Sequence, residues 1–231
     1  MLNEAVKMYG FPTRKPGISG EEFHDHWRHP HATLSIRIPT ITAYTQCHRI
    51  DTALLGTQQQ RVDGIAEVWF ANAADAAGMP NRPEYRDIVK PDEPNFTDTS
   101  TLLFAYVRDE VLSPGAPAGG STDEADRAWT PDRGVTTKLM IVTEAGGNEN
   151  WAAERDLALG RSIGALRHVR AWPANELYEA SSPLVIGVHE LWWPTVSDFE
   201  RGIARNPAAF DELVDRPQKG FALLTQAEKV M

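Results

Sequence analysis

Short apolar, β-rich runs alternate with helical patterns along this chain. In the first part, strands are predicted at residues 4–11, 41–50, 65–70 and 101–107. Between the first two strands, Ser19 and Glu22 have the spacing of a capping box, so we expect a helix from about residue 19 to residue 37, ended by Pro39. Asn72 and Thr195 are each followed by an aspartate three residues later and are expected to cap two further helices.

The same order of elements recurs in the second part of the chain. Strands are predicted at residues 137–143, 166–172, 184–193 and 220–228, and helices at 149–163 and 196–214. A constant shift of 123 residues places residues 67–75 on residues 190–198, so that Glu67, Trp69 and Asp75 meet Glu190, Trp192 and Asp198. The two parts are therefore interpreted as divergent copies of one unit.

Each copy has the order βαββαβ, which is the ferredoxin-like split βαβ unit. Helices cover one face of such a sheet, and the other apolar face must be covered by something else. The sequence therefore predicts an α+β fold in which two ferredoxin-like βαββαβ repeats pack sheet to sheet within one chain. The expected parts are a first repeat at 1–110, a Pro/Gly-rich linker at 111–136 and a degenerate second repeat at 137–231.

Composition and charge exclude several classes of function. The chain has 231 residues, 42% of them hydrophobic, and a net charge of −9 with no block of Lys or Arg. Such a chain is a poor partner for nucleic acid or for an anionic membrane surface, and no partner of either kind is expected. The single cysteine, Cys47, rules out an intrachain disulfide and a Cys-rich zinc site. We see no signal peptide or membrane-spanning run, and we expect a cytoplasmic protein.

Four of the seven histidines lie close together, at His24, His26, His29 and His31. Their spacings are two, three, five and seven residues, and none is the four-residue spacing that suits two metal ligands on one helix face. Because three of these side chains cannot converge on one ion from a regular helix, we expect no metal site. His26 and His29 are interpreted as solvated.

His31 differs from the other histidines because it shares a helix face with Phe23 and Trp27, at i, i+4 and i+8. It is either a satisfied core residue or a partly buried imidazole that serves as a general acid or base near neutral pH. Pro30 removes a hydrogen bond from the His26 carbonyl, so a kink is expected nearby. The matching helix of the second copy has no histidine, so one active pocket is expected.

The strand faces leave two alternatives open. On residues 65–70, Ala66, Val68 and Phe70 would form the dry interface between sheets, which would turn Glu67 and Trp69 toward the helices and His31. Alternatively, Glu67 is an edge or ion-paired carboxylate. On residues 41–50, Tyr44, Gln46 and His48 share one face, and the sequence does not decide which face that is.

Four short motifs in this order resemble the EthD family of the dimeric α+β barrel superfamily. They are Phe23, Trp27 and His31, then Pro39 with residues 44–46, then residues 63–70, then residues 92–98. The likeness covers residues 3–110, and the second half resembles a degenerate copy. It implies ferredoxin-like units paired through their sheets and a pocket between helices and sheet, with His31 beside Trp27. Members of the superfamily include cofactor-free monooxygenases, isomerases, dehydratases of aromatic polyketides and heme enzymes.

We therefore expect a cofactor-independent lyase or isomerase that acts on a small hydrophobic aromatic or cyclic metabolite, in a catabolic or secondary-metabolite pathway. His31 and Glu67 are the expected catalytic residues. The substrate-binding residues are predicted to be Trp27, Tyr44, Trp69, His24 and His48. The alternatives are a heme-binding or cofactor-free oxygenase and a non-catalytic small-molecule carrier. A homodimer in addition to the pairing within the chain is left open.

Overall fold

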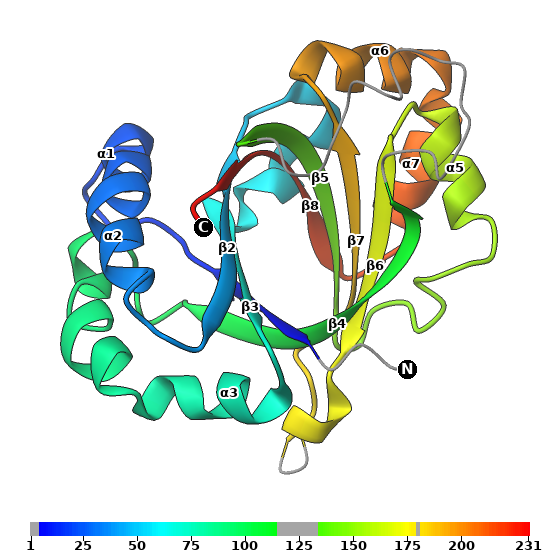
Figure 1. The fold of residues 1–231 in the computed structure, drawn as a ribbon. Coiled ribbons are helices and arrows are strands. Elements are labelled where there is room, and N and C mark those ends of the chain that lie inside the picture. The colour runs from blue at the N-terminus through cyan, green and yellow to red at the C-terminus, as the bar shows by residue number, and fades with distance from the viewer. Residues whose placement is uncertain (1–4, 115–133, 179–180) are drawn as a thin grey trace.

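The computed structural model describes residues 5–114, 134–178 and 181–231, which form a closed antiparallel barrel with helices outside it (Figure 1). Going around the barrel, the strand order is β1-β3-β2-β8-β5-β7-β6-β4. The strands are β1 (Val6–Phe11), β2 (Ile41–Arg49), β3 (Gly64–Phe70), β4 (Leu103–Pro114), β5 (Val135–Glu144), β6 (Arg167–Pro173), β7 (Val185–Trp193) and β8 (Gly220–Lys229).

All eight predicted strands are present, within a few residues of their expected ends apart from the longer β4. The first half contributes β4-β1-β3-β2 and the second half contributes β8-β5-β7-β6, so the strands of both halves follow one order. The two sheets do more than pack face to face, because β2 pairs with β8 and β4 pairs with β6. These two seams close the barrel and satisfy the backbone groups that an open sheet edge would leave unpaired.

The expected linker is shorter than its composition indicates. Residues 111–114 belong to β4, which extends to pair with β6 of the other half, and residues 135–136 belong to β5, which extends to pair with β8 of its own half. Residues 115–133 of the expected linker lie outside the described residues.

The first long helix is continuous from Gly20 to Ser35 but contains one π turn. It consists of α1 (Gly20–His26), the π turn (Trp27–His31) and α2 (Ala32–Ser35), and Ser19 and Glu22 form the predicted capping box. The π turn contains Pro30, which has no N–H to offer the carbonyl of His26. The helix accommodates Pro30 by widening, and the backbone N–H of Ala32 bonds back to the carbonyl of Trp27. The expected kink is thus a local widening.

The remaining helices are short. The first half has a 3₁₀ segment at Ala53–Arg61, helix α3 (Ala73–Gly78) and the turns Met79–Asn81, Glu84–Val89 and Glu93–Asn95. The second half has α5 (Asp156–Ser162), a 3₁₀ turn at Asn175–Leu177, α6 (Val196–Arg205) and α7 (Pro207–Asp215). The helix expected at 196–214 is two helices, because Asn206 caps a new helix that begins with Pro207. No helix of the described ranges is long and apolar enough to cross a bilayer.

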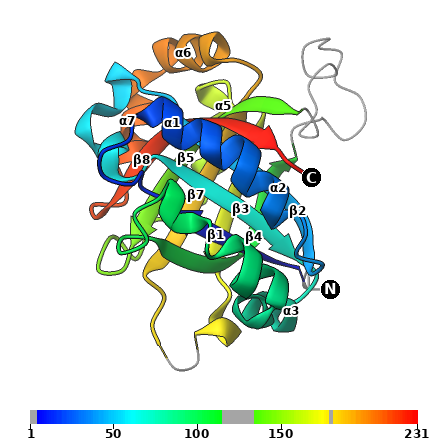
Figure 2. The same ribbon diagram turned by 90° about the vertical axis from the view of Figure 1, so that its left-hand side faces the viewer.

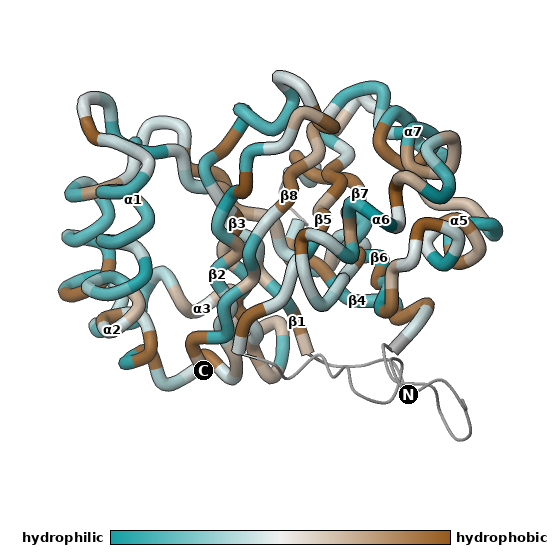
Figure 3. The backbone as a smooth tube through the Cα atoms, turned by 90° about the horizontal axis from the view of Figure 1, so that it is seen from above, coloured by the Kyte–Doolittle hydropathy of each residue, from teal (hydrophilic) through white to brown (hydrophobic). Residues whose placement is uncertain are grey.

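The helices cover the barrel on two sides. In Figures 1 and 3, α1 and α2 lie on one side of the barrel and α5 and α7 lie on the other, and Figure 2 shows α1 and α2 running across the first-half sheet. On the second-half side, Trp193, Phe199, Phe210 and Leu213 belong to one buried apolar cluster. A separate apolar cluster, which includes Phe11, Ile65, Met140 and Phe221, fills part of the barrel interior. Both faces of the strands are therefore buried.

Candidate active site

A largely apolar pocket lies between the long first helix and the outer face of the first-half sheet. The unfilled space in it is about 70 Å³. Its polar groups come from His31, Ser35, Tyr44, Tyr85, Glu93 and Thr97. The other lining residues are Met8, Gly10, Pro12, Trp27, Ile38, Ile41, Ala66, Val68, Met79, Val89, Phe96, Leu102 and Phe104. The pocket thus combines a hydrophobic wall with a few placed polar groups, as small-molecule sites do.

His31 lies on this pocket wall with Asp92 behind it. The Nδ1 of His31 is 3.0 Å from Oδ2 of Asp92, and only 9% of His31 is exposed. The hydrogen bond with His31, helped by bonds with Asn95 and His26, holds the pKa of Asp92 well below its usual range. Asp92 is therefore an ionised acceptor, which assigns the proton of a neutral His31 to Nδ1. The Nε2 of His31 makes no hydrogen bond to a described residue, and so its lone pair remains available.

The π turn explains how two histidines reach the same carboxylate. The Nε2 of His26 is 2.9 Å from Oδ1 of Asp92, while His31 bonds the other oxygen. In a regular α-helix, residues five positions apart point about 140° away from each other. A turn closed by an i→i+5 bond brings such residues close to one face of the helix. The interpretation of His26 as a solvated residue is therefore wrong, whereas His29 is exposed as expected.

Tyr44 and Trp27 are joined at the base of the pocket. The indole Nε1 of Trp27 donates to the hydroxyl of Tyr44 at 3.0 Å, and both side chains are buried. Gln46 completes the group, because its Nε2 donates to the carbonyl of Trp27 at 2.7 Å and to the Tyr44 hydroxyl at 2.9 Å. These bonds decide the open question about residues 41–50, since they place Tyr44 and Gln46 on the helix-facing side.

His24 and His48 lie beside this group and do not line the pocket. Their Nδ1 atoms are 2.9 Å apart, and the His48 ring packs 4.7 Å from the Trp27 ring. Burial lowers the pKa of His48 to about 3, so the ring is neutral at pH 7. In the part of the chain that is described, no three His, Cys, Asp or Glu side chains are grouped so as to hold a metal ion. His48 contacts Trp27 and His24 contacts His48, and neither histidine is among the residues that line the pocket.

Glu67 and Trp69 are not near His31, which corrects the predicted strand face. Ala66 and Val68 line the pocket, whereas Glu67 points into the barrel interior and pairs with Lys138. Trp69 also faces the interior, with the ammonium of Lys7 5.4 Å from its ring. The prediction failed because both faces of this strand are buried, so alternation of apolar residues could not separate them.

Glu67 belongs to a buried layer of charged residues inside the barrel. Lys7 contacts Glu190 at 2.7 Å, and Lys138 contacts Glu67 and, at 3.2 Å, Glu190. Tyr9 donates to Glu190 as well. Lys7 and Lys138 lie on β1 and β5, the first strands of the two halves, and Glu67 matches Glu190 in the predicted repeat. The two pairs are therefore reciprocal, each joining a lysine of one half to a glutamate of the other.

Three site residues were not singled out in the sequence. Asp92 orients His31, and Tyr85 donates to Glu93 at 2.9 Å on the pocket wall, where burial raises the pKa of Glu93. Asp92 and Glu93 lie in the motif at 92–98, so that motif was the available signal. Nothing in the sequence indicates that a carboxylate 61 residues after His31 returns to it.

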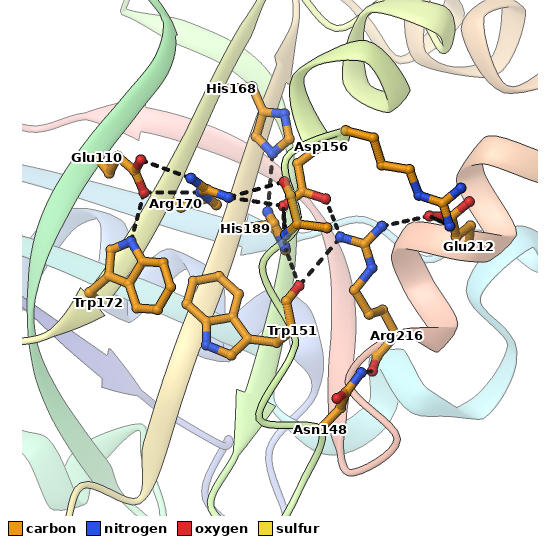
Figure 4. Close-up of polar contacts among 12 residues, drawn as sticks. Glu110, Asn148, Trp151, Asp156, His168, Arg170, Trp172, His189, Glu212 and Arg216 are labelled. Atoms are coloured by element: carbon orange, nitrogen blue, oxygen red, sulfur yellow. Dashed lines mark hydrogen bonds and ion pairs between the residues drawn. The ribbon is translucent and has the colours of Figure 1, made fainter.

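The matching region of the second half contains a buried network of polar side chains. Trp151 packs against Gly187, where a Cβ atom would overlap the indole ring. Asp156, which is fully buried, holds Arg216 and Arg170 (Figure 4). A ring nitrogen of His189 bonds a nitrogen of His168 at 3.1 Å, and the other lies 3.1 Å from the Trp151 carbonyl. Helix α5 carries no histidine. This network holds the segment before α5 against the barrel.

A solved structure shares the overall fold of this chain. An anthrone oxidase-like protein of known structure superposes with a TM-score of 0.62 at 14% identity, over 99% of this chain and 92% of that one. A proposed monooxygenase from Lactobacillus acidophilus NCFM gives 0.48 at 8% identity, over 99% and 95%. A chlorite dismutase variant from Candidatus Nitrospira defluvii gives 0.46 at 11%, over 100% and 94%. At 14% identity, the likeness to the anthrone oxidase-like protein is one of fold alone.

No curated protein matches the sequence. The family model of the EthD domain matches residues 15–100, a range that contains Trp27, His31, Tyr44 and Asp92. Residues 15–100 thus resemble the EthD domain, and they supply His31, Asp92 and most of the side chains that line the pocket.

Proposed function

We propose that this protein is an enzyme that moves a proton on a small hydrophobic molecule, with His31 as general acid and base. The observation that carries the proposal is the hydrogen bond between His31 and Asp92 at the wall of an apolar pocket. Asp92 fixes the ring and its tautomer and stabilises the imidazolium that forms when Nε2 takes a proton. Positioned acid–base catalysis of this kind contributes about 10²–10⁴-fold.

The pocket favours a reaction that returns the proton it takes. Its walls are mainly Met, Ile, Val, Phe and Trp side chains, which exclude water and strengthen the few polar contacts. An isomerisation returns the proton to another carbon, and an elimination gives it to a leaving hydroxyl. Neither reaction needs an electron acceptor, so a lyase or isomerase acting on a cyclic or aromatic metabolite remains our first proposal.

The size of the pocket limits the ligand. A cavity of about 150 Å³ accepts benzene, and the space here is about 70 Å³. A ring therefore enters only if lining side chains move. Met8 and Met79 are on the wall, and unbranched Met side chains change rotamer readily. We propose that these two side chains adapt to the ligand.

A heme does not fit the same site. Ligand pockets typically have volumes of about 300–1,000 Å³. The unfilled space beside His31 is about 70 Å³. We therefore derive no step through a heme. Cofactor-free oxygenation is a second candidate, favoured by the likeness to the anthrone oxidase-like protein over nearly the full chain. Deprotonation by His31 is the first step of either reaction, and oxygen uptake in an electrode assay distinguishes them.

The test begins with mass spectrometry of ligands that co-purify with the protein, followed by assays of the identified compound and its relatives. The compared proteins are wild type, His31→Ala, Asp92→Asn and, as a control, His29→Ala, since His29 is exposed. Turnover by wild type that falls about 10²–10⁴-fold in His31→Ala supports the proposal. Tight binding that survives His31→Ala, with no turnover by wild type, shows a carrier instead.

We further propose that the two halves are divergent copies and that only the first has kept an open pocket. Trp27 packs over Gly64 in the first half, and Trp151 packs over Gly187 in the second. The glycines are 123 residues apart, the same shift that relates Glu67 to Glu190. The reciprocal lysine–glutamate pairs inside the barrel support the same relationship.

A further inference from the structure

We propose that the hydroxyl of Tyr44 donates the hydrogen bond that stabilises an oxyanion in this pocket, and that the substrate is a small cyclic ketone. His31 would remove a proton from the carbon next to the carbonyl, and Tyr44 would bind the carbonyl oxygen as negative charge develops there. The inference rests on the proposed function and assigns its substrate class and a second catalytic residue.

The hydrogen bonds of Tyr44 leave its proton for a ligand. A phenol oxygen has two acceptor positions and one O–H donor. Trp27 Nε1 donates to this oxygen at 3.0 Å, and Gln46 Nε2 donates at 2.9 Å. Both acceptor positions are therefore used. Tyr44 is 2% exposed and lines the pocket, and no acceptor for its proton is recorded in the described ranges.

The orientation of Gln46 follows from its other partners. The atom that bonds Tyr44 also lies 2.7 Å from the carbonyl oxygen of Trp27, which can only accept, so that atom is the amide nitrogen. The amide oxygen in turn lies 3.2 Å from His48 Nε2. Because the contact between Gln46 and Tyr44 is thus N–H to oxygen, Tyr44 cannot give its proton to Gln46.

The first helix supplies this arrangement. The π turn at Pro30 leaves the Trp27 carbonyl bonded to the N–H of Ala32, and that carbonyl also accepts from Gln46. Gly64 provides room for the Trp27 ring, because a Cβ there would overlap it. Tyr44 is therefore held by two donors that are themselves fixed.

The phenol stays protonated where it is needed as a donor. Burial raises the pKa of Tyr44 to about 12, although the two N–H bonds act in the opposite direction. At pH 7 the group is therefore a neutral donor in a dry pocket. The other lining phenol differs, because Tyr85 already gives its proton to Glu93 at 2.9 Å. Of these two hydroxyls, only that of Tyr44 has its proton left for a ligand.

The step balances without an oxidant. His31 Nε2 bonds the proton of the C–H next to the carbonyl, and the C–H electron pair forms a carbon–carbon double bond. The π pair of the carbonyl moves to oxygen, which accepts the O–H of Tyr44. The oxygen pair then re-forms the carbonyl. In an isomerisation of a ketone with a β,γ double bond, the imidazolium gives its proton to the γ-carbon as the double bond moves into conjugation. In an elimination, it gives the proton to a β-hydroxyl, whose C–O bond breaks so that water leaves. Such a preorganised donor contributes about 10²–10³-fold.

The test uses cyclohexanone and its oxygen-free counterpart, methylenecyclohexane, which have similar shapes. Binding is followed by saturation-transfer NMR, and exchange of the protons next to the carbonyl is followed in D₂O by proton NMR. We expect the wild-type protein to bind cyclohexanone more tightly than methylenecyclohexane and to catalyse exchange of the protons next to the carbonyl. In Tyr44→Phe, the preference should disappear and exchange should fall about 10²–10³-fold. Tyr178→Phe, outside the pocket, is the matched control and should behave as wild type.

The outcomes separate the two proposals. Exchange that is lost in His31→Ala but kept within about 3-fold in folded Tyr44→Phe overturns the assignment of Tyr44 alone. Exchange that persists in His31→Ala overturns the proposed function. If Tyr44→Phe does not fold, the infrared carbonyl stretch of cyclohexanone bound to wild type decides, since a hydrogen bond lowers it relative to hexane. An unshifted stretch, or failure of wild type to bind the ketone at millimolar concentration, overturns the inference.

Discussion

His31 and Asp92 are 61 residues apart in the sequence and 3.0 Å apart in the structure, and their contact sets the tautomer of the pocket histidine. Asp92→Asn should therefore lower kcat/KM about 10²–10⁴-fold with the fold kept, because an amide can donate to Nδ1 and move the ring proton to Nε2. Turnover on the identified substrate and a thermal melt check this prediction. His26→Gln is the control, since His26 bonds the other carboxylate oxygen, and its effect should be much smaller. Full activity in Asp92→Asn would contradict the role given to Asp92.

The glycines under the two tryptophans should respond differently to the same substitution. A Cβ at Gly64 would overlap the Trp27 ring and lie 2.8 Å from the Cys47 carbonyl oxygen, and a Cβ at Gly187 would overlap Trp151. Both Gly→Ala variants should lose about 1–3 kcal/mol of stability from overpacking. Only Gly64→Ala should also reduce activity, because it displaces Trp27, whose indole N–H donates to the Tyr44 hydroxyl. Urea unfolding and turnover measure the two effects, and equal loss of activity in both variants would show that the pocket does not depend on Trp27.

Glu190 should matter more for stability than its counterpart Glu67. Burial alone would raise the pKa of Glu190, but Lys138 and Lys7 outweigh burial and hold the pKa well below its usual range. Burial and the charge of Glu190 raise the pKa of Glu67 to about 7, so glutamine resembles the form that is partly present at neutral pH. Glu190→Gln removes a carboxylate that two buried ammonium groups share, leaving Lys7 with Asp109 and Lys138 with Glu67, and should cost about 3–5 kcal/mol.

Glu67→Gln should cost less, about 1–3 kcal/mol, because its protonated form is already accessible. Urea denaturation at pH 7 compares the two variants, and a larger loss in Glu67→Gln would reverse our assignment of the charge. Neither side chain lines the pocket, so turnover by the folded fraction should be nearly unchanged in both. A selective loss of activity in Glu67→Gln would restore the role in catalysis that the sequence suggested.

Three buried histidines should make the fold sensitive to mild acid. Burial lowers the pKa of His48 and His168 to about 3 and that of His189 to about 4, whereas an unfolded histidine titrates near pH 6.5. Between these values the unfolded chain binds protons that the folded chain does not, so stability falls as pH decreases from about 6.5 to about 4. The loss is on the order of 1 kcal/mol per pH unit for each histidine.

Urea unfolding at pH 7, 6 and 5 measures this dependence. His48→Gln should flatten it, and His29→Gln should leave it unchanged, because His29 is exposed. Glu67, whose pKa is raised to about 7, acts in the opposite direction, so the same series is measured in Glu67→Gln. An unfolding free energy that does not fall from pH 7 to pH 5 in that variant would contradict the lowered pKa of these histidines.

Local sequence patterns determined the elements of this protein. Hydrophobic runs placed all eight strands, and Ser19 with Glu22 fixed the start of the first helix through a capping box that the structure contains. The stripe of Phe23, Trp27 and His31 gave the buried side of that helix. Pro30 indicated a disturbed turn. These features depend on residues within one or two turns of each other, and so they can be read without the fold.

Only the tertiary structure decided which side of each strand meets the helices. Glu67 and Tyr44 lie on neighbouring strands, yet one points into the barrel and the other into the pocket. Alternation has a period of two residues but no absolute direction when both faces are buried. The partner of His31 was likewise undetermined, because Asp92 reaches it through a loop whose path depends on packing. Contacts between distant residues depend on how the barrel closes, and no local sequence pattern predicts them.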